Sequence, residues 1–269
     1  MNKMKITFIG GGVMGEAMLS AILDKGLSMP QAISVSDIDE ARRQYLEQEY
    51  GVAVMSDNRL AVTKGEVVVL AIKPQNLVEV MAELNGRFNS SQLVLSIIAG
   101  ARIDTLWLGL NHSCVVRAMP NTPAQIGEGV SVWTATAEVT EQQKEWAGSI
   151  LGAMGKEIYV DDEKYIDMAT AVSGSGPAYF FLMVESLVNA AVHIGLPCDM
   201  AQELVLQTIL GSGHFIQRSG KSPAELRTMV TSPGGTTAEA LLQLEKGGFS
   251  DLVMQAVSAA YDKAKRLGG

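Results

Sequence analysis

Residues rich in Val and Ile form short runs that alternate with helix-like segments over about the first 160 residues. Several of these runs are apolar at consecutive positions, which is typical of strands covered on both faces of a sheet. The predicted strands are residues 5–9, 32–36, 66–72, 92–98, 113–119 and 129–135. Between them, residues 13–26 and 39–51 have helical patterns that end in glycine. The alternation predicts an N-terminal Rossmann-type domain, a doubly wound and mostly parallel α/β sheet.

After about residue 160 the strand signals stop and the pattern becomes helical. The predicted helices are residues 165–174, 177–195, 199–220, 222–230 and 236–248, separated by stretches such as GSGP and SPGG. We therefore predict two domains, a dinucleotide-binding domain over residues 1–160 and an all-helical domain over residues 161–269.

The predicted helix over residues 177–195 is apolar almost all round. A helix on a protein surface has one polar face, so this helix is expected to be buried on several sides. A helical domain of about 110 residues can hardly bury such a helix alone, so we expect the chain to form a homodimer through this domain.

Composition and charge narrow the possible functions. The chain of 269 residues is 47% hydrophobic and 19% charged, with a formal net charge of −8 and no basic run, which argues against nucleic acid as the main partner. No segment approaches the roughly 18 to 20 uninterrupted apolar residues of a membrane span, and none resembles a signal peptide. The two cysteines, Cys114 and Cys198, form neither a disulfide framework nor a clustered metal site. We expect no metal and a location in the cytoplasm.

A glycine motif, Gly10-x-Gly12-x-x-Gly15, follows the first predicted strand and opens a helix. In a dinucleotide fold the first glycine makes the tight turn, the second lets the backbone approach the pyrophosphate, and the third lets the helix pack on the strand. A purely structural turn is the alternative, but the position at the first strand of an alternating α/β pattern favours a dinucleotide site.

The end of the second predicted strand leaves the nucleotide preference open. Asp37 lies 22 residues beyond Gly15, near the spacing of the acid that binds the adenine ribose in NAD enzymes. Arg42 and Arg43 follow and can favour a 2′-phosphate, or they can simply face solvent on a helix. The sequence does not decide between NADH and NADPH.

Two further stretches follow predicted strands, at the sheet edge where such folds bind ligands. AIKPQ contains Lys73, which is either a cofactor contact or a solvated strand-end lysine. RAMPNTPA contains Asn121 between two prolines, either as a cofactor contact or as a turn residue that bonds its own backbone.

The helical half contains two Gly- and Ser-rich helix starts, AVSGSGPAY and TSPGGTTAEAL. The first stretch can also be a simple break between two helices, without a ligand. Together they predict a compact polar pocket that faces the dinucleotide. The predicted substrate residues from these two stretches are Ser173, Gly174, Ser175, Gly234, Gly235, Thr236 and Thr237. A helix that begins near Gly234 presents backbone N–H groups and its positive dipole end to an anion.

These motifs, with FIGGGVMGEAM, AIKPQ and RAMPNTPA, occur in the order and approximate spacing of pyrroline-5-carboxylate reductases, which the chain resembles from about residue 5 to residue 265. The resemblance implies reduction of 1-pyrroline-5-carboxylate to proline by NADPH or NADH. It also implies a helical domain that interlocks with that of a partner, often with dimers assembled into a ring.

The resemblance also implies positions for the ligands. It places the cofactor along Gly10, Gly11, Gly12, Val13, Met14, Ser36, Asn58, Ala71, Ile72, Lys73, Pro74 and Ala99. Gly15, Asp37 and Asn121 complete the predicted cofactor site. Thr236 and Thr237 would lie against the substrate, with Glu163 near the pocket. Asp37 departs from the small or hydroxylic residue of many members, which weakens the expectation of NADPH use.

The chemistry of imine reduction fits these residues. It needs a hydride donor, a hydrogen-bonded imine nitrogen and a clamp on the carboxylate, but no base to remove a hydroxyl proton. We predict that the Thr237 hydroxyl hydrogen-bonds the imine nitrogen. The related 3-hydroxyacid dehydrogenases carry a catalytic lysine on the helix after their glycine motif, whereas SGSGPAYFFLMVESL contains none. Such a dehydrogenase, a broader imine reductase and a non-catalytic dinucleotide sensor are the alternatives.

Overall fold

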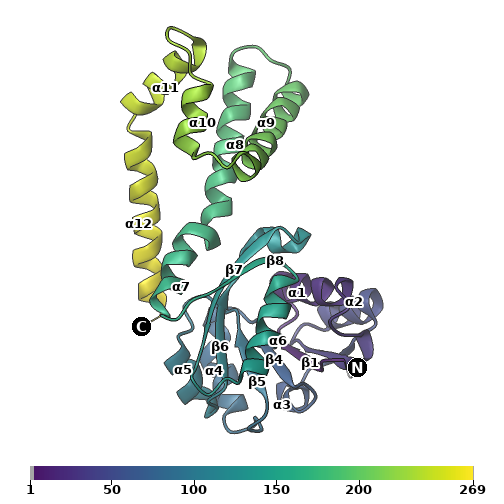
Figure 1. The fold of residues 1–269 in the computed structure, drawn as a ribbon. Coiled ribbons are helices and arrows are strands. Elements are labelled where there is room, and N and C mark those ends of the chain that lie inside the picture. The colour runs from purple at the N-terminus through teal and green to yellow at the C-terminus, as the bar shows by residue number, and fades with distance from the viewer. Residues whose placement is uncertain (1–2, 269) are drawn as a thin grey trace. The chain divides into compact units, whose positions relative to one another are not determined.

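The computed structural model describes residues 3–268. Contacts divide the chain into two compact units, one formed by residues up to Pro177 together with residues from Ala259 onward, and one formed by Ala178–Ser258. Figure 1 shows the sheet with its flanking helices and the helices of the C-terminal part. The predicted boundary at residue 160 was placed where the sequence pattern changes from strands to helices, and it stays a prediction.

The first unit is built on one sheet of eight strands, in the order β3-β2-β1-β4-β5-β6-β7-β8. The strands are β1 (Ile6–Ile9), β2 (Ile33–Ser36), β3 (Ala53–Met55), β4 (Val67–Leu70), β5 (Leu93–Ser96), β6 (Val115–Met119), β7 (Gly129–Ala135) and β8 (Gly155–Tyr159). Neighbouring strands are parallel except β6 and β7, which pair antiparallel. The strand order reverses at β1 and β4, which lie side by side in the middle, and this is where open α/β sheets bind ligands.

Helices follow most of the strands. They are α1 (Val13–Asp24), α2 (Glu40–Tyr50), α3 (Asn58–Val62), α4 (Leu77–Leu84), α5 (Ile103–Leu110), α6 (Glu141–Gly152) and α7 (Lys164–Ala169). Short 3-10 helices occur as η1 (Pro30–Ala32), η2 (Pro74–Asn76) and η3 (Thr122–Ile126), and a π-helical turn, η4 (Thr170–Gly174), follows α7.

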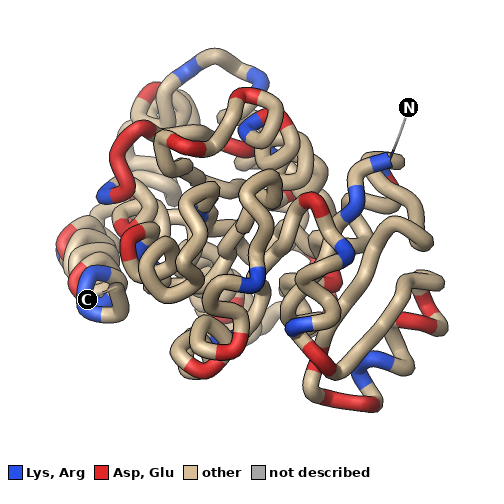
Figure 2. The backbone as a smooth tube through the Cα atoms, turned by 90° about the horizontal axis from the view of Figure 1, so that it is seen from below, with Lys and Arg blue, Asp and Glu red and all other residues tan. Residues whose placement is uncertain are grey.

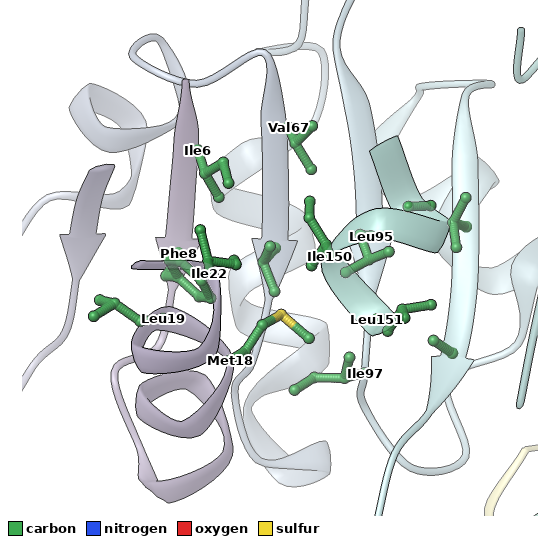
Figure 3. Packing of buried hydrophobic residues seen from close by; sticks show 14 of the residues in the cluster. Ile6, Phe8, Met18, Leu19, Ile22, Val67, Leu95, Ile97, Ile150 and Leu151 are labelled. Carbon is green, nitrogen blue, oxygen red and sulfur yellow. The ribbon is translucent and has the colours of Figure 1, made fainter. Parts of the chain in front are cut away.

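The sheet carries a separate hydrophobic cluster on each face, because successive strand residues point to opposite sides. In β4, Val67 and Val69 pack in the cluster that contains side chains of α1, α2 and α6, whereas Val68 and Leu70 pack in the cluster that contains side chains of α3, α4 and α5. Figure 3 shows part of the first cluster, with Met18 and Ile22 of α1 close to the sheet. The doubly wound α/β prediction is confirmed.

The remaining helices are α8 (Gly176–His193), α9 (Cys198–Ser219), α10 (Pro223–Met229), α11 (Thr236–Lys246) and α12 (Phe249–Leu267). The second unit contains most of α8 and all of α9 to α11, so its predicted all-helical character is confirmed over the described residues. Ser222 begins α10 with a capping box to Glu225, which satisfies backbone N–H groups at the helix start.

Several elements were not predicted by residue range, among them the helices α3 to α6, the strands β3 and β8 and the last helix, α12. β3 and β8 were not predicted, since the first has only three residues and the second, GKEIY, has charged side chains and exposed positions. The last helix, α12, was also not predicted, although its C-terminal end packs on the first unit, where Leu267 lies against Gly100. The six predicted strands and the five predicted C-terminal helices are present, with residues 170–174 in a π-helical rather than an α-helical turn.

The helix α8 is exposed within one chain instead of buried. Phe180, Phe181 and Leu182 each expose about two thirds of their surface. The helical stretch over residues 164–193 has the length and mean hydropathy, 1.2, that a membrane span can have, judged by composition alone. No segment of this kind was expected from the sequence. That expectation considered only uninterrupted apolar runs, and Glu185 interrupts the run in α8.

The strands β7 and β8 approach each other closely at a glycine, Gly155. Gly155 has φ +136°, and a Cβ placed on it would overlap the carbonyl of Gly129, its partner in the register. We expect Gly155→Ala to lower the free energy of unfolding by roughly 2 kcal/mol, through backbone strain and the loss of close pairing. Urea unfolding followed by circular dichroism measures this change.

Gly148→Ala is the matched control, because a Cβ at Gly148 in α6 would meet its nearest neighbour, Trp133, at 3.7 Å. It should unfold at or above the wild-type urea concentration, since Ala favours a helix more than Gly. Equal unfolding of Gly155→Ala and wild type would contradict this account of the strand pair.

Candidate functional site

The glycine loop lies between β1 and α1 and has the backbone geometry of a close turn. Gly10 has φ +97°, and its N–H donates to the Ser36 carbonyl at 2.8 Å. A Cβ on Gly10 would lie 2.7 Å from the Ala71 carbonyl oxygen, and one on Gly15 would lie 2.7 Å from the Gly10 oxygen. A Cβ on Gly12 would meet no heavy atom within 4 Å. The first and third glycines are therefore needed by the fold, and the open side of the second is where a ligand can approach.

The helix α1 begins directly on this loop. Gly12 is its N-cap, has extended backbone and places no side chain over the helix end. The first backbone bond that returns to the cap runs from the Glu16 N–H to the Gly12 oxygen at 2.9 Å. The N–H groups of Val13, Met14 and Gly15 have no partner within the helix, and together with the helix dipole they can hold a phosphate.

Asp37 follows β2 and is fixed to the glycine loop. Its carboxylate accepts the Gly11 N–H at 2.7 Å with one oxygen and the Asp39 N–H at 2.9 Å with the other. Ser36, the last residue of β2, is buried, and its hydroxyl has no hydrogen-bond partner among the described residues. The predicted ribose-binding acid thus lies beside the predicted pyrophosphate loop.

The two arginines in the first turn of α2, Arg42 and Arg43, both form hydrogen bonds with neighbouring residues. The Arg42 guanidinium donates to the Gly11 carbonyl and to the Glu16 carboxylate, and its side chain is only 24% exposed. Arg43 donates from one guanidinium nitrogen to the Asp37 carbonyl at 2.7 Å and to the Ile38 carbonyl at 3.1 Å. Arg42 therefore does not lie on a solvated helix face, whereas for Arg43 both interpretations stay open.

Glu16 is the centre of a polar cluster beside the loop. It accepts from Arg42, from the Tyr45 hydroxyl at 3.0 Å and from the Tyr50 hydroxyl at 2.8 Å. Burial acts to raise the pKa of Glu16, but the hydrogen bonds from Arg42, Tyr50 and Tyr45 outweigh it and lower that pKa. Burial and Glu16 together raise the pKa of Tyr50 to about 12. Glu16 therefore carries its negative charge at neutral pH.

The other predicted cofactor residues lie after β3, β4 and β5. Ala71 bonds β1 through its N–H, at 2.9 Å from the Ile9 oxygen. Lys73 is exposed and extended just before Pro74 and η2. Ile72 packs against one of the core clusters, and Ala99 is half-buried after β5. The Asn58 amide, at the start of α3, donates to Glu83 at 2.8 Å.

Asn121 has a structural role that neither sequence reading described. Its Oδ1 accepts the backbone N–H of Val130 at 2.8 Å, so it bonds the beginning of β7 rather than its own turn. This bond fixes the segment between β6 and η3, at the same sheet edge as the other residues.

A buried ion-pair cluster surrounds Arg117 and was not predicted from the sequence. Arg117 lies on β6, is 2% exposed, and donates to Glu163 at 2.7 Å and to Asp167 at 2.6 Å. The same Glu163 oxygen accepts the Ile103 N–H at 2.8 Å. The only available signal was an arginine inside the apolar run SCVVRAM, which a strand buried on both faces can hold only if it is paired.

Ser173, Gly174 and Ser175 follow this cluster along the chain. They lie at the π-helical turn η4, an irregularity that is frequent at functional sites. The Ser173 hydroxyl donates to the Ala169 oxygen at 2.9 Å, and the Ser175 N–H donates to the Thr170 oxygen at 2.8 Å. A Cβ on Gly174 would lie 3.0 Å from the Met119 methyl, so the turn packs closely on the end of β6.

The second glycine loop opens α11 in the second unit. Gly234 has φ +71°, and Gly235 is the N-cap with extended backbone and an N–H bonded to the Ser232 oxygen at 3.1 Å. Thr236 and Thr237 are the first two residues of the helix, and Thr237 is half-buried. No side chain caps this helix start, so its first N–H groups can receive an anion.

The candidate residues thus divide between the two units. The predicted cofactor residues and Glu163, Ser173, Gly174 and Ser175 belong to the first unit, and the Gly234 to Thr237 stretch belongs to the second. Figure 2 shows that basic and acidic residues are interspersed along the backbone.

Two family models match the chain. The model described as pyrroline-5-carboxylate reductase dimerisation matches residues 163–267, and the model described as NADP oxidoreductase, coenzyme F420-dependent, matches residues 5–100. The first begins at the Arg117 partner Glu163 and includes the second glycine loop. The second covers the first glycine loop.

Curated relatives and solved structures match over the full length. Pyrroline-5-carboxylate reductase of Synechocystis is 42% identical over 98% of both chains, and that of Pseudomonas aeruginosa is 40% identical over 99% of this chain and 98% of the relative. The Plasmodium falciparum pyrroline carboxylate reductase structure with NADP bound is 33% identical, with TM-score 0.91 and 100% coverage of both chains.

The buried cluster predicts a stability effect. Arg117→Met should lower the free energy of unfolding by about 3 kcal/mol, because it leaves the Glu163 and Asp167 side chains without the guanidinium that pairs with both of them. Thermal melting followed by circular dichroism measures the loss.

Lys144→Met provides the control, since Lys144 pairs with Glu141 on an exposed helix face. It should melt close to wild type. Equal melting of both variants would show that the Arg117 cluster does not hold the sheet and α7 together.

Proposed function

The chain belongs to the pyrroline-5-carboxylate reductase family, and from this we propose how its residues reduce 1-pyrroline-5-carboxylate to proline with NAD(P)H. The observation that carries the proposal is the pair of glycine-led helix starts, one in each unit, neither capped by a side chain. The start of α1 suits the pyrophosphate of a dinucleotide. The start of α11 is therefore free for a second anion, the substrate carboxylate.

We assign the cofactor to the first unit. The N–H groups of Val13, Met14 and Gly15 would hold the pyrophosphate, and Asp37 would bind the adenine ribose. The reduced nicotinamide, when bound, supplies the hydride to the imine carbon. Ala71 to Pro74, Ala99 and Asn121 would line its path, since they follow strands at the same sheet edge.

We assign the substrate carboxylate to the free N–H groups of the first turn of α11, among them those of Thr236 and Thr237, at the positive end of the helix dipole. The Thr237 hydroxyl would donate a hydrogen bond to the imine nitrogen. This nitrogen becomes more basic as the neighbouring carbon gains the hydride, and it takes up a proton from water. Ser173 to Ser175 and Glu163 would form the rest of the pocket. Catalysis then depends mainly on the orientation of the nicotinamide against the imine carbon, and the reaction needs no strong base.

Thr237 is the residue whose hydroxyl the mechanism needs most directly. Thr237→Ala should lower kcat at least tenfold with a smaller effect on KM, which corresponds to a lost transition-state contact of roughly 1.4 kcal/mol. Thr237→Ser should recover much of the rate, because it keeps the hydroxyl. The measurement is steady-state oxidation of NADPH and of NADH with 1-pyrroline-5-carboxylate.

Thr105→Ala is the matched control, because Thr105 lies at an exposed position in the first turn of another helix, α5. It should retain wild-type kinetics. Wild-type kinetics in Thr237→Ala would remove Thr237 from the mechanism.

We further propose that two chains assemble through α8 and that the dimers build a ring. The match to a dimerisation model over residues 163–267 and the exposed apolar side chains of α8 support the dimer. An interface that covers such a face would stabilise the assembly by burial of apolar area. We also propose a cytoplasmic location, without membrane or nucleic-acid partners. The free thiols of Cys114 and Cys198 support a reducing compartment.

The apolar face of α8 gives a direct prediction. Phe181→Asp should convert the dimer into monomers at micromolar concentration, because a charge in the interface loses its hydration. Sedimentation velocity measures the change in mass. Leu60→Asp, at a similarly exposed apolar residue of α3, should leave the assembly intact. A wild-type chain that sediments as a monomer would contradict the proposal.

A further inference from the structure

We propose that this chain selects NADH over NADPH, through the Asp37 carboxylate and through Glu16, which holds the Arg42 side chain on the glycine loop. The proposal rests on the cofactor site proposed above and concerns which dinucleotide that site takes. It depends on how the charged side chains around the β2–α2 turn are already bonded to one another.

The position of the Asp37 carboxylate is set by the loop itself. Two backbone N–H groups, of Gly11 and Asp39, bind its two oxygens at 2.7 and 2.9 Å, so the group cannot turn away without losing both bonds. Each carboxylate oxygen can accept a second hydrogen bond. The two adjacent hydroxyls of an adenine ribose suit these free positions, as in NAD-binding folds where an acid follows the second strand.

A 2′-phosphate at the same place would meet a negative charge. Phosphate oxygens cannot donate to the carboxylate, so the ribose would lose a hydrogen bond and gain a like-charge contact at short range. A compensating cation at the turn is required for NADPH to bind well, and Arg42 and Arg43 are the cations that follow along the chain.

Both arginines already have hydrogen-bond partners, Arg42 on the glycine loop and Arg43, through one guanidinium nitrogen, at the turn itself. Arg42 is paired with Glu16 and bonded to the Gly11 carbonyl, and Arg43 is bonded to the carbonyls of Asp37 and Ile38. Glu16 is itself held by the hydroxyls of Tyr45 and Tyr50. To reach a 2′-phosphate, Arg42 would have to leave a negative partner that two tyrosine hydroxyls keep in place, so the charge of Arg42 is already neutralised locally.

The test is a binding measurement without the imine. Titration of the purified full-length protein with NADH and with NADPH, by isothermal calorimetry, gives two dissociation constants and their ratio. We expect wild type to bind NADH at least tenfold more tightly than NADPH. Tighter or equal binding of NADPH would overturn the proposal. Because no substrate is present, the ratio is independent of whether the chain reduces 1-pyrroline-5-carboxylate.

Variants separate the two acids. Asp37→Ser should lower the ratio of the NADPH to the NADH dissociation constant at least tenfold, and Asp37→Asn, which keeps the shape of the side chain, should lower it in the same direction. Asp39→Ser removes the same charge two residues away and keeps a residue that can cap α2, so it should leave the ratio within twofold. An equal change in Asp37→Ser and Asp39→Ser would overturn the assignment to Asp37.

Glu16→Gln tests whether Glu16 holds the Arg42 side chain on the glycine loop. It removes the negative partner of Arg42 but keeps a polar side chain of the same size, so NADPH should bind several-fold more tightly while the NADH dissociation constant stays within twofold. An unchanged NADPH affinity would show that Glu16 does not restrain Arg42. Circular dichroism of each variant establishes that the sheet is intact before the titrations are compared.

Discussion

The close approach of backbone to backbone at the middle of the sheet is the constraint on which the rest of this molecule depends. Gly10 turns the chain against the Ala71 carbonyl, and Gly15 sets α1 against the Gly10 carbonyl. These contacts allow α1 to begin directly after β1, where the strand order of the sheet reverses. The free N–H groups of its first turn then lie at the edge where the other parallel strands end. The same turn fixes Asp37, because the Gly11 N–H is one of the donors that hold its carboxylate.

A second constraint links the sheet to the helices that follow it. Arg117 is a charge inside an otherwise apolar strand, and it is tolerated because Glu163 and Asp167 pair with it. These acids belong to α7 and the residue before it, so the ion pairs fix the start of the stretch that leads through the π-helical turn to Ser173 and Gly174. The cluster therefore has a positioning role that the family resemblance alone, which indicated only Glu163, did not explain.

Much of this arrangement could be predicted from the sequence. The continuous Val- and Ile-rich runs gave six strands, and the glycine spacing gave the dinucleotide loop, because both depend on local patterns. β8 was missed because its stability comes from pairing with β7, including the contact of Gly155 with Gly129, and not from its own composition. The bonds of Arg42 and Arg117 join residues distant in sequence, so periodicity could not reveal them.

The central claim is that the two glycine-led helix starts serve one reaction, the reduction of a cyclic imine by a bound dinucleotide. The most direct measurement is a stoichiometric one on the purified protein, in which loss of reduced dinucleotide absorbance and formation of proline are followed together after addition of 1-pyrroline-5-carboxylate. The account predicts saturable turnover with one proline formed for each dinucleotide oxidised. Tight dinucleotide binding with no proline formed, using either NADH or NADPH, would contradict it.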